Sequence, residues 1–314
     1  MSIKILLESV AKPTNRAIEI TDDAQILVHD PQTVRENIEE VVRSAVFGST
    51  DEKHAAQWLV RECALQFGII PSSIHDLYLA RAAGKVRDDF TVPAINLRSL
   101  PYYAAKAVFR AADKISAKAM IFELARSEMG YTEQPPAEYA SNILGAAIAE
   151  GYQGPIFLQG DHFQVSKKRF ETNAQAEINA IRELCANSVR AGFFNIDIDT
   201  STLVDLSKQS IPEQQQLNYS NCADFASYIR DIEREGVTIS LGGEIGEVGG
   251  QNSTEPELRA FMQGFDQSYR DAKPEHPGLS KISIQTGTSH GGIVLADGSI
   301  AEVSVDFEIL LVDD

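Results

Sequence analysis

Histidine and acidic side chains follow several short apolar segments of the sequence. Asp161 and His162 come after PIFLQG, Glu244 comes after TISLGG, and His290 comes after SIQTGTS. Imidazole nitrogen and carboxylate oxygen are donors that bind zinc and similar divalent cations in proteins. An adjacent carboxylate can transfer a proton beside such a cation. The combination is typical of a site for metal-assisted chemistry.

Other polar residues lie in or after the neighbouring apolar segments. Asn96 ends FTVPAIN, Glu123 lies within KAMIFEL, and Asp199 ends FFNIDID. A His or Asp directly after a strand is also a common cap or turn residue. That structural role is the alternative for each residue taken alone, whereas their joint placement favours a shared site.

Two glycine pairs follow the segments that carry Glu244 and His290. Gly250 and Gly291 belong to these pairs, and backbone N–H groups that no side chain shields can bind phosphate. Ordinary turn formation is the alternative. Together with the polar residues, the glycines are compatible with an anionic ligand.

The apolar segments must be positioned by a regular fold. Stretches with helical spacing, such as YYAAKAVFRAADKI, lie between them, and repeated strand-then-helix units predict a parallel sheet. In a TIM (β/α)8-type barrel, the carboxyl ends of the strands meet at one mouth. We therefore predict an α/β fold of this type. The candidate strands begin at Phe90, Lys118, Pro155, Phe193, Val237 and Lys281.

The number of units is smaller than a complete barrel needs. Such a barrel takes about 250 residues, and residues 88–314 hold only six strand segments. The sequence thus predicts a barrel domain truncated after six strands. A doubly wound open sheet, which needs no closure, is the alternative. Residues 1–87 carry helical patterns and are predicted to form a mostly helical N-terminal extension.

Composition excludes several classes of partner and compartment. The 314 residues include 28 Lys and Arg against 45 Asp and Glu, a net charge of −17. Nucleic acids and anionic membranes attract clustered basic residues, so neither is an expected partner. The chain has 3 cysteines without metal-site spacing. Residues 1–20 hold no apolar run long enough for a secretory leader, so none is expected, and no membrane-length apolar run occurs in the sequence. A cytoplasmic location is expected.

The same segments resemble the class II, metal-dependent ketose-bisphosphate aldolases. The resemblance lies in FTVPAINLRSLPYYAAKAVFRAA, PIFLQGDHFQ, AGFFNIDIDTS, GGEIGEVGG and KISIQTGTSHGG, which occur in the family's order, and in the following DFEIL. It implies that His162 and His290 are zinc ligands with Glu244 beside the metal. Asp161 would be the catalytic carboxylate, and Asp199 would bind substrate.

The remaining site residues are assigned with the same family in view. Asn96, Gly250 and Gly291 are predicted to bind substrate. Glu255 is the candidate proton donor, because QNSTEPE replaces the acidic stretch from which the family draws that donor. The family also has a third zinc histidine in its seventh strand, and no histidine follows His290 in this chain.

The resemblance implies a zinc-dependent aldehyde-lyase of carbohydrate metabolism, such as glycolysis. It would cleave fructose or tagatose 1,6-bisphosphate to dihydroxyacetone phosphate and an aldehyde, using Zn²⁺ or another divalent cation. The missing histidine favours an alternative, a catalytically inactive, aldolase-like structural or regulatory subunit. A third hypothesis is a metal-dependent enzyme of the same fold that acts on another sugar phosphate. Homo-oligomers are common in the family, so a homo-oligomer is expected.

Overall fold

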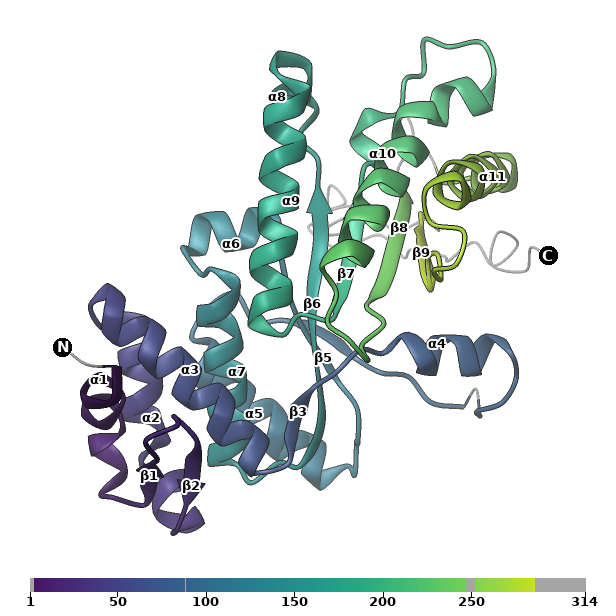
Figure 1. Ribbon diagram of the computed structural model, residues 1–314. Coiled ribbons are helices and arrows are strands. Elements are labelled where there is room, and N and C mark those ends of the chain that lie inside the picture. Colours follow the sequence, from purple (N-terminus) through teal and green to yellow (C-terminus); the bar gives the residue numbers. More distant parts are fainter. Residues whose placement is uncertain (1–2, 88, 247–251, 286–314) are drawn as a thin grey trace, which may run out of the picture. The chain divides into compact units, whose positions relative to one another are not determined.

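The computed structural model describes residues 3–87, 89–246 and 252–285 (Figure 1). The chain forms two compact units. The first holds the residues up to Asp161 together with Asn187–Asn195. The second holds His162–Ala186 and the described residues from Ile196 onward.

The N-terminal part of the first unit is mainly helical, as the sequence predicted. Two further elements were not predicted. One is a small antiparallel hairpin, and the other is the short strand β3, which pairs in parallel with the start of β6. The elements are α1 (Ile3–Ala11), the 3-10 turn η1 (Lys12–Thr14), β1 (Ile18–Ile20), β2 (Ile26–Val28), α2 (Pro31–Phe47), α3 (Thr50–Gln66), β3 (Ile69–Pro71) and α4 (His75–Ala82).

Helix α2 shows how the local sequence sets this region. The Asp30 side chain caps the helix by accepting from the backbone N–H groups of Gln32 and Thr33, each at 3.1 Å, and proline is favoured at the first helical position. Val34 and Ile38, which share one face of the helix because they are four residues apart, are fully buried. Figure 1 shows α2, α3 and α7 grouped together, and these three helices contact one another.

The contact between α2 and α7 depends on a glycine. A Cβ atom at Gly145 of α7 would lie 2.3 Å from Val42 Cγ2. Gly145→Ala should therefore lower the free energy of unfolding by about 1–3 kcal/mol, the usual range for an overpacked core. Urea denaturation measures the change.

A matched control for this substitution is Gly130→Ala in α6, where an added Cβ would have no atom within 4 Å. It should stabilise the chain by about 0.5–1 kcal/mol, because alanine favours helix over glycine. Equal effects of the two substitutions would contradict the packing argument.

Three parallel strands organise the rest of the first unit. Ile121 of β5 is in register with Ala94 of β4 and with Phe157 of β6. Helices connect the strands, as expected for repeated strand–helix units. The elements are β4 (Ala94–Asn96), α5 (Pro101–Lys114), β5 (Ile121–Ala125), α6 (Arg126–Thr132), α7 (Pro136–Ala149) and β6 (Gly154–Gln164), whose last three residues belong to the second unit.

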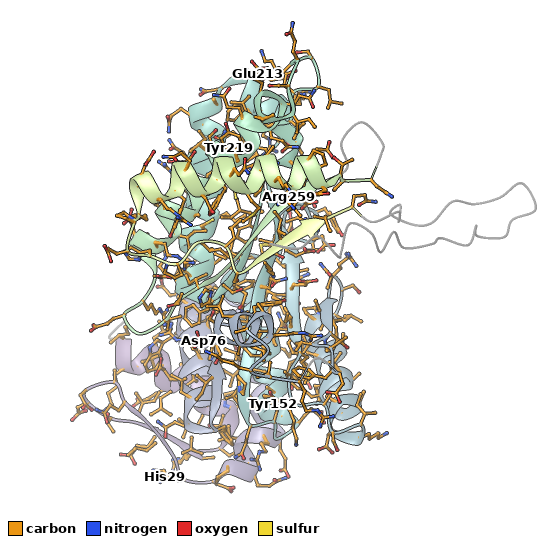
Figure 2. All side chains as sticks on the ribbon, turned by 90° about the vertical axis from the view of Figure 1, so that its right-hand side faces the viewer. His29, Asp76, Tyr152, Glu213, Tyr219 and Arg259 are labelled. Atoms are coloured by element: carbon orange, nitrogen blue, oxygen red, sulfur yellow. The ribbon has the colours of Figure 1, made fainter. Side chains whose placement is uncertain are left out.

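The second unit repeats the pattern. Glu244 of β8 is in parallel register with Ser283 of β9. Gly264 of α11 packs on the Tyr219 ring of α10, where an added Cβ would lie 2.5 Å from the ring (Figure 2). The elements are α8 (Lys167–Thr172), α9 (Ala174–Ala191), β7 (Asn195–Asp199), η2 (Ser201–Leu203), α10 (Ile211–Ile232), β8 (Ser240–Gly246), α11 (Glu255–Ala272) and β9 (Lys281–Ile284). The residues of α9 from Asn187 onward and the first residue of β7 belong to the first unit.

The predicted α/β class and all six predicted strands, β4 to β9, are confirmed. The strand order is consecutive within each unit: β4-β5-β6 in the first and β7-β8-β9 in the second. Parallel strands in consecutive order are also what a TIM barrel has, so the order within each unit is consistent with a truncated barrel. Among the described residues, no helix has the length and apolar character needed to cross a membrane.

Candidate active site

Asn96, at the end of β4, and Asp161, within β6, were both predicted from the sequence, and they meet in the first unit. The Asn96 side-chain amide donates to Asp161 Oδ2 at 2.9 Å and to Glu128 Oε2 at 3.0 Å. Both amide hydrogens are therefore engaged, and both acceptors are carboxylates. The arrangement fixes the orientation of the Asp161 carboxylate.

Glu128 is a residue of this site that the sequence interpretation missed. It lies in the first turn of α6, is 6% exposed, and accepts from the Ala125 N–H at 2.9 Å. Arg98 pairs with its other oxygen. Glu128 lies three residues after the end of β5, in the first turn of α6. A glutamate at this position is a helix-capping signal, and that signal could have identified it from the sequence.

The pKa of Glu128 reflects opposing influences. Burial acts to raise it, but the hydrogen bonds from Ala125, Asn96 and Arg98 together hold the pKa below its ordinary value of 4.5. A carboxyl with a lowered pKa in the folded state stabilises the fold above its unfolded pKa. That stability is lost as the pH falls through the folded pKa.

Glu128→Gln tests this linkage. The neutral amide should lower the free energy of unfolding at pH 7 by about 1.5–3 kcal/mol, the usual worth of hydrogen bonds to charged groups. The difference from wild type should shrink as the pH falls below about 4.5. Chemical denaturation at several pH values measures this. The exposed Glu235→Gln should have little effect, and a difference independent of pH would contradict the assignment.

Three side chains converge in the second unit. His162 Nδ1 lies 2.7 Å from Glu244 Oε2 and 4.0 Å from Asp199 Oδ2. One donor atom from each residue lies within 4.8 Å of the others. His162 and Glu244 were predicted at the metal together with His290, whereas Asp199 was assigned to substrate. In the described part of the chain it is Asp199 that completes a group able to hold a cation.

The donor set and its surroundings fit a divalent cation. One imidazole nitrogen and two carboxylate oxygens suit zinc or a similar ion. Asp199 is 1% exposed, and its oxygens accept from the Ser201 hydroxyl at 2.6 Å and from the Gln164 amide at 2.5 Å. Such outer hydrogen bonds orient metal-binding carboxylates.

The electrostatics of Glu244 favour a positive charge nearby. Burial raises the pKa of its carboxyl, the hydrogen bond with His162 opposes the rise, and the charges of Asp199 and Asp197 add to it. A buried carboxylate among like charges is stabilised in its ionised form by a cation.

His162 has an unusual backbone conformation. Its φ of 44° lies in the left-handed region, which costs a residue other than glycine about 1–2 kcal/mol. Such strain concentrates at functional sites. Because successive side chains of a regular strand alternate between faces, this conformation changes the direction of the His162 side chain from the one that alternation would give.

Asp197, which lies two residues before Asp199 on β7, forms an ion pair with Lys281 at the start of β9. Lys281 Nζ lies 2.7 Å from Asp197 Oδ1. Gly242 makes room for the pair, because a Cβ there would lie 2.4 Å from Asp197 Oδ1 and 3.0 Å from Lys281 Cε. Strand residues two apart share a face, so Asp197 lies on the same face of β7 as Asp199.

The other predicted site residues are placed as follows. Glu255 begins α11, and its half-exposed carboxylate accepts from Arg259 Nε at 2.7 Å (Figure 2 labels Arg259). Gly250, His290 and Gly291 lie outside the described residues. The roles assigned to these four residues stay predictions.

Comparisons with known proteins give a weak, partial similarity to an aldolase subunit. The D-tagatose-1,6-bisphosphate aldolase subunit GatZ of Escherichia coli strains SMS-3-5 and K12 is 28% identical to this chain over 151 residues, which cover 45% of this chain and 35% of the relative. A crystal structure of a probable tagatose 6 phosphate kinase from Sinorhizobium meliloti 1021 has a TM-score of 0.47 and 15% identity, covering 64% of this chain and 50% of that one. No family model matches the chain.

Proposed function

We propose that the chain acts in a metal-dependent aldolase that cleaves fructose or tagatose 1,6-bisphosphate to dihydroxyacetone phosphate and an aldehyde. The observation that carries the proposal is the group of His162, Asp199 and Glu244, whose donors suit a divalent cation. The partial similarity to tagatose-bisphosphate aldolase subunits supports the class of substrate.

In this proposal His162, Asp199 and Glu244 hold the cation, and His290 is a further candidate ligand. Zn²⁺ bound there would supply Lewis acidity that polarises the ketose carbonyl and favours the enediolate. Burial and hydrogen bonds keep the Asp199 oxygens in place, and Glu244 Oε2 lies 2.7 Å from His162 Nδ1. Their ionised forms are needed for binding, so protonation competes with the metal.

Asp161 is the proposed proton acceptor. Its carboxylate would take the proton of the C4 hydroxyl, C4 would become the aldehyde carbon, and the electrons of the C3–C4 bond would pass to C3. Asn96 holds Asp161 Oδ2, so we assign it the orientation of that carboxylate in addition to substrate binding. Protonation at C3 then gives dihydroxyacetone phosphate, with Glu255 as the proposed donor.

The test is a triose-phosphate release assay on both sugar bisphosphates. Protein treated with EDTA should be inactive, and Zn²⁺ should restore cleavage. Cleavage that is unchanged after complete metal removal would contradict the proposal. Gly250 and Gly291 are the proposed phosphate-binding residues, so substitution of either by valine should raise KM more than it lowers kcat.

A second candidate function is a structural or regulatory subunit of such an aldolase. The observation that favours it is that the matched relatives are themselves named subunits. This function predicts a folded chain that cleaves neither sugar with Zn²⁺ present, yet raises the specific activity of a catalytic class II aldolase chain from the same cell. Absence of any such increase would contradict it.

A further inference from the structure

A cavity of about 370 Å³ is formed in the first unit by side chains of α2, α5 and α7 and of the segments that precede α5 and α7. We call it the α2–α7 cavity. Its walls are largely apolar and aromatic, and they include Val42, Phe47, Leu100, Tyr102 and Tyr103. Small-molecule sites in proteins usually have a volume of about 300–1,000 Å³ and apolar walls that carry a few polar groups. The α2–α7 cavity therefore has the size and the lining of a site for a small organic molecule.

Three of the four charged residues that line the α2–α7 cavity have a partner within the chain. Both arginines lie beside a glutamate, and one glutamate accepts a hydrogen bond from a tyrosine. The pairs are Arg98 with Glu128, Arg43 with Glu40 at 3.8 Å, and Glu39 with the Tyr103 hydroxyl at 2.5 Å. The paired arginines make the cavity a poor site for an anion, because a bound anion would compete with a carboxylate for each of them.

Glu138 is the fourth charged residue of the lining. It lies in the first turn of α7 and is 9% exposed, and no hydrogen bond reaches its carboxylate from the described part of the chain. Burial raises the pKa of its carboxyl above the ordinary value of 4.5, and the charge of Lys53 opposes the rise. A buried polar group without a hydrogen-bond partner is costly, so a ligand that donates to this carboxylate would stabilise it.

Asn142 adds a second oxygen on the same side of the cavity. It lies four residues after Glu138 on α7, a spacing that places the two side chains on one face of the helix. Asn142 is 5% exposed, and its side-chain nitrogen donates to the Glu138 backbone oxygen at 3.0 Å. Its side-chain oxygen can therefore accept a hydrogen bond from a ligand. The buried side of the cavity thus offers acceptors, and one of them is an acid.

We propose that the α2–α7 cavity binds a small molecule that carries a primary ammonium group on an aromatic body. The ammonium supplies a positive charge and several N–H donors, which would reach the Glu138 carboxylate and the Asn142 oxygen. The aromatic body would pack against the rings of Tyr102 and Tyr103, since aromatic pairs gain more than their buried area alone provides. A wholly apolar ligand would leave the Glu138 carboxylate without a donor.

Isothermal titration calorimetry with tryptamine tests the proposal. Tryptophol and indole-3-propionate are neutral and anionic compounds of similar shape, and ethylamine has the ammonium group without the ring. The wild-type chain should bind one tryptamine, and it should bind each of the other compounds at least about tenfold more weakly, the factor expected when a hydrogen bond between charged groups is lost. Ethylamine also measures the general attraction of cations to a chain of net charge −17.

Glu138→Gln tests the assigned carboxylate. It should weaken tryptamine binding at least about tenfold and leave tryptophol binding nearly unchanged. The variant should fold, because burial disfavours the charge that the substitution removes. The control is Glu183→Gln, at an exposed glutamate of α9 that does not line the cavity, and it should bind tryptamine as wild type does. The proposal would be overturned if tryptamine did not bind, if it bound no better than ethylamine or tryptophol, or if Glu138→Gln kept the wild-type affinity.

Discussion

His162→Asn is expected to lower the affinity of the chain for Zn²⁺ by about 100-fold or more. Loss of an outer hydrogen bond alone typically costs 10–100-fold, and this substitution removes the nitrogen donor itself. Asparagine tolerates the left-handed region better than most residues, so the backbone at φ 44° is retained. The two remaining carboxylates, Asp199 and Glu244, would favour harder cations such as Mg²⁺. Isothermal titration calorimetry on metal-free protein measures both changes.

The control for this substitution is another histidine that pairs with a glutamate. His29 Nε2 lies 2.8 Å from the Glu19 carboxylate, both side chains are exposed, and His29→Asn should leave Zn²⁺ affinity unchanged. If His162→Asn bound Zn²⁺ as tightly as wild type, the three-residue group would not be the metal site. The strain at His162 would then have another cause.

The strands were predictable because their signals are local. Each of the six is a short run of apolar or β-branched residues bounded by turn residues, and each occurs where the pattern placed it. Strand β3 was missed because Ile69–Pro71 is only three residues long and ends in proline. Its parallel pairing with the start of β6 depends on residues far away in the sequence, which a local pattern does not record.

The residue types of the candidate site were predictable from the sequence. Which of these side chains lie close together was less predictable. Strand-end position identified Asp161, His162 and Glu244. The role of Asp199 as a third possible ligand depends on the distance between β7 and β8, which spacing along the chain does not give. Likewise, no local signal indicates that His162 takes a positive φ, since such a conformation is imposed by surrounding structure.

Asp161→Asn is expected to lower kcat for sugar bisphosphate cleavage by about 10²–10⁴-fold, the usual contribution of a positioned general base. The amide oxygen can still accept the hydrogen bond from Asn96, so the geometry around Asn96 and Glu128 is kept while the basic oxygen is lost. KM should change little, and the free energy of unfolding should stay close to wild type. Asp205→Asn, at an exposed residue outside the site, is the control.

The same variant separates the two proposed functions when it is assayed with a catalytic aldolase chain. If this chain is the enzyme, Asp161→Asn removes cleavage by the isolated protein. If the chain is a supporting subunit, the isolated protein has no activity to lose. The Asp161→Asn protein should then still stimulate the catalytic chain. In a supporting subunit the Asp161 carboxylate transfers no proton, so an amide of the same shape can replace it. Normal cleavage by isolated Asp161→Asn protein would contradict the catalytic role outright, since no proton acceptor would remain at that position.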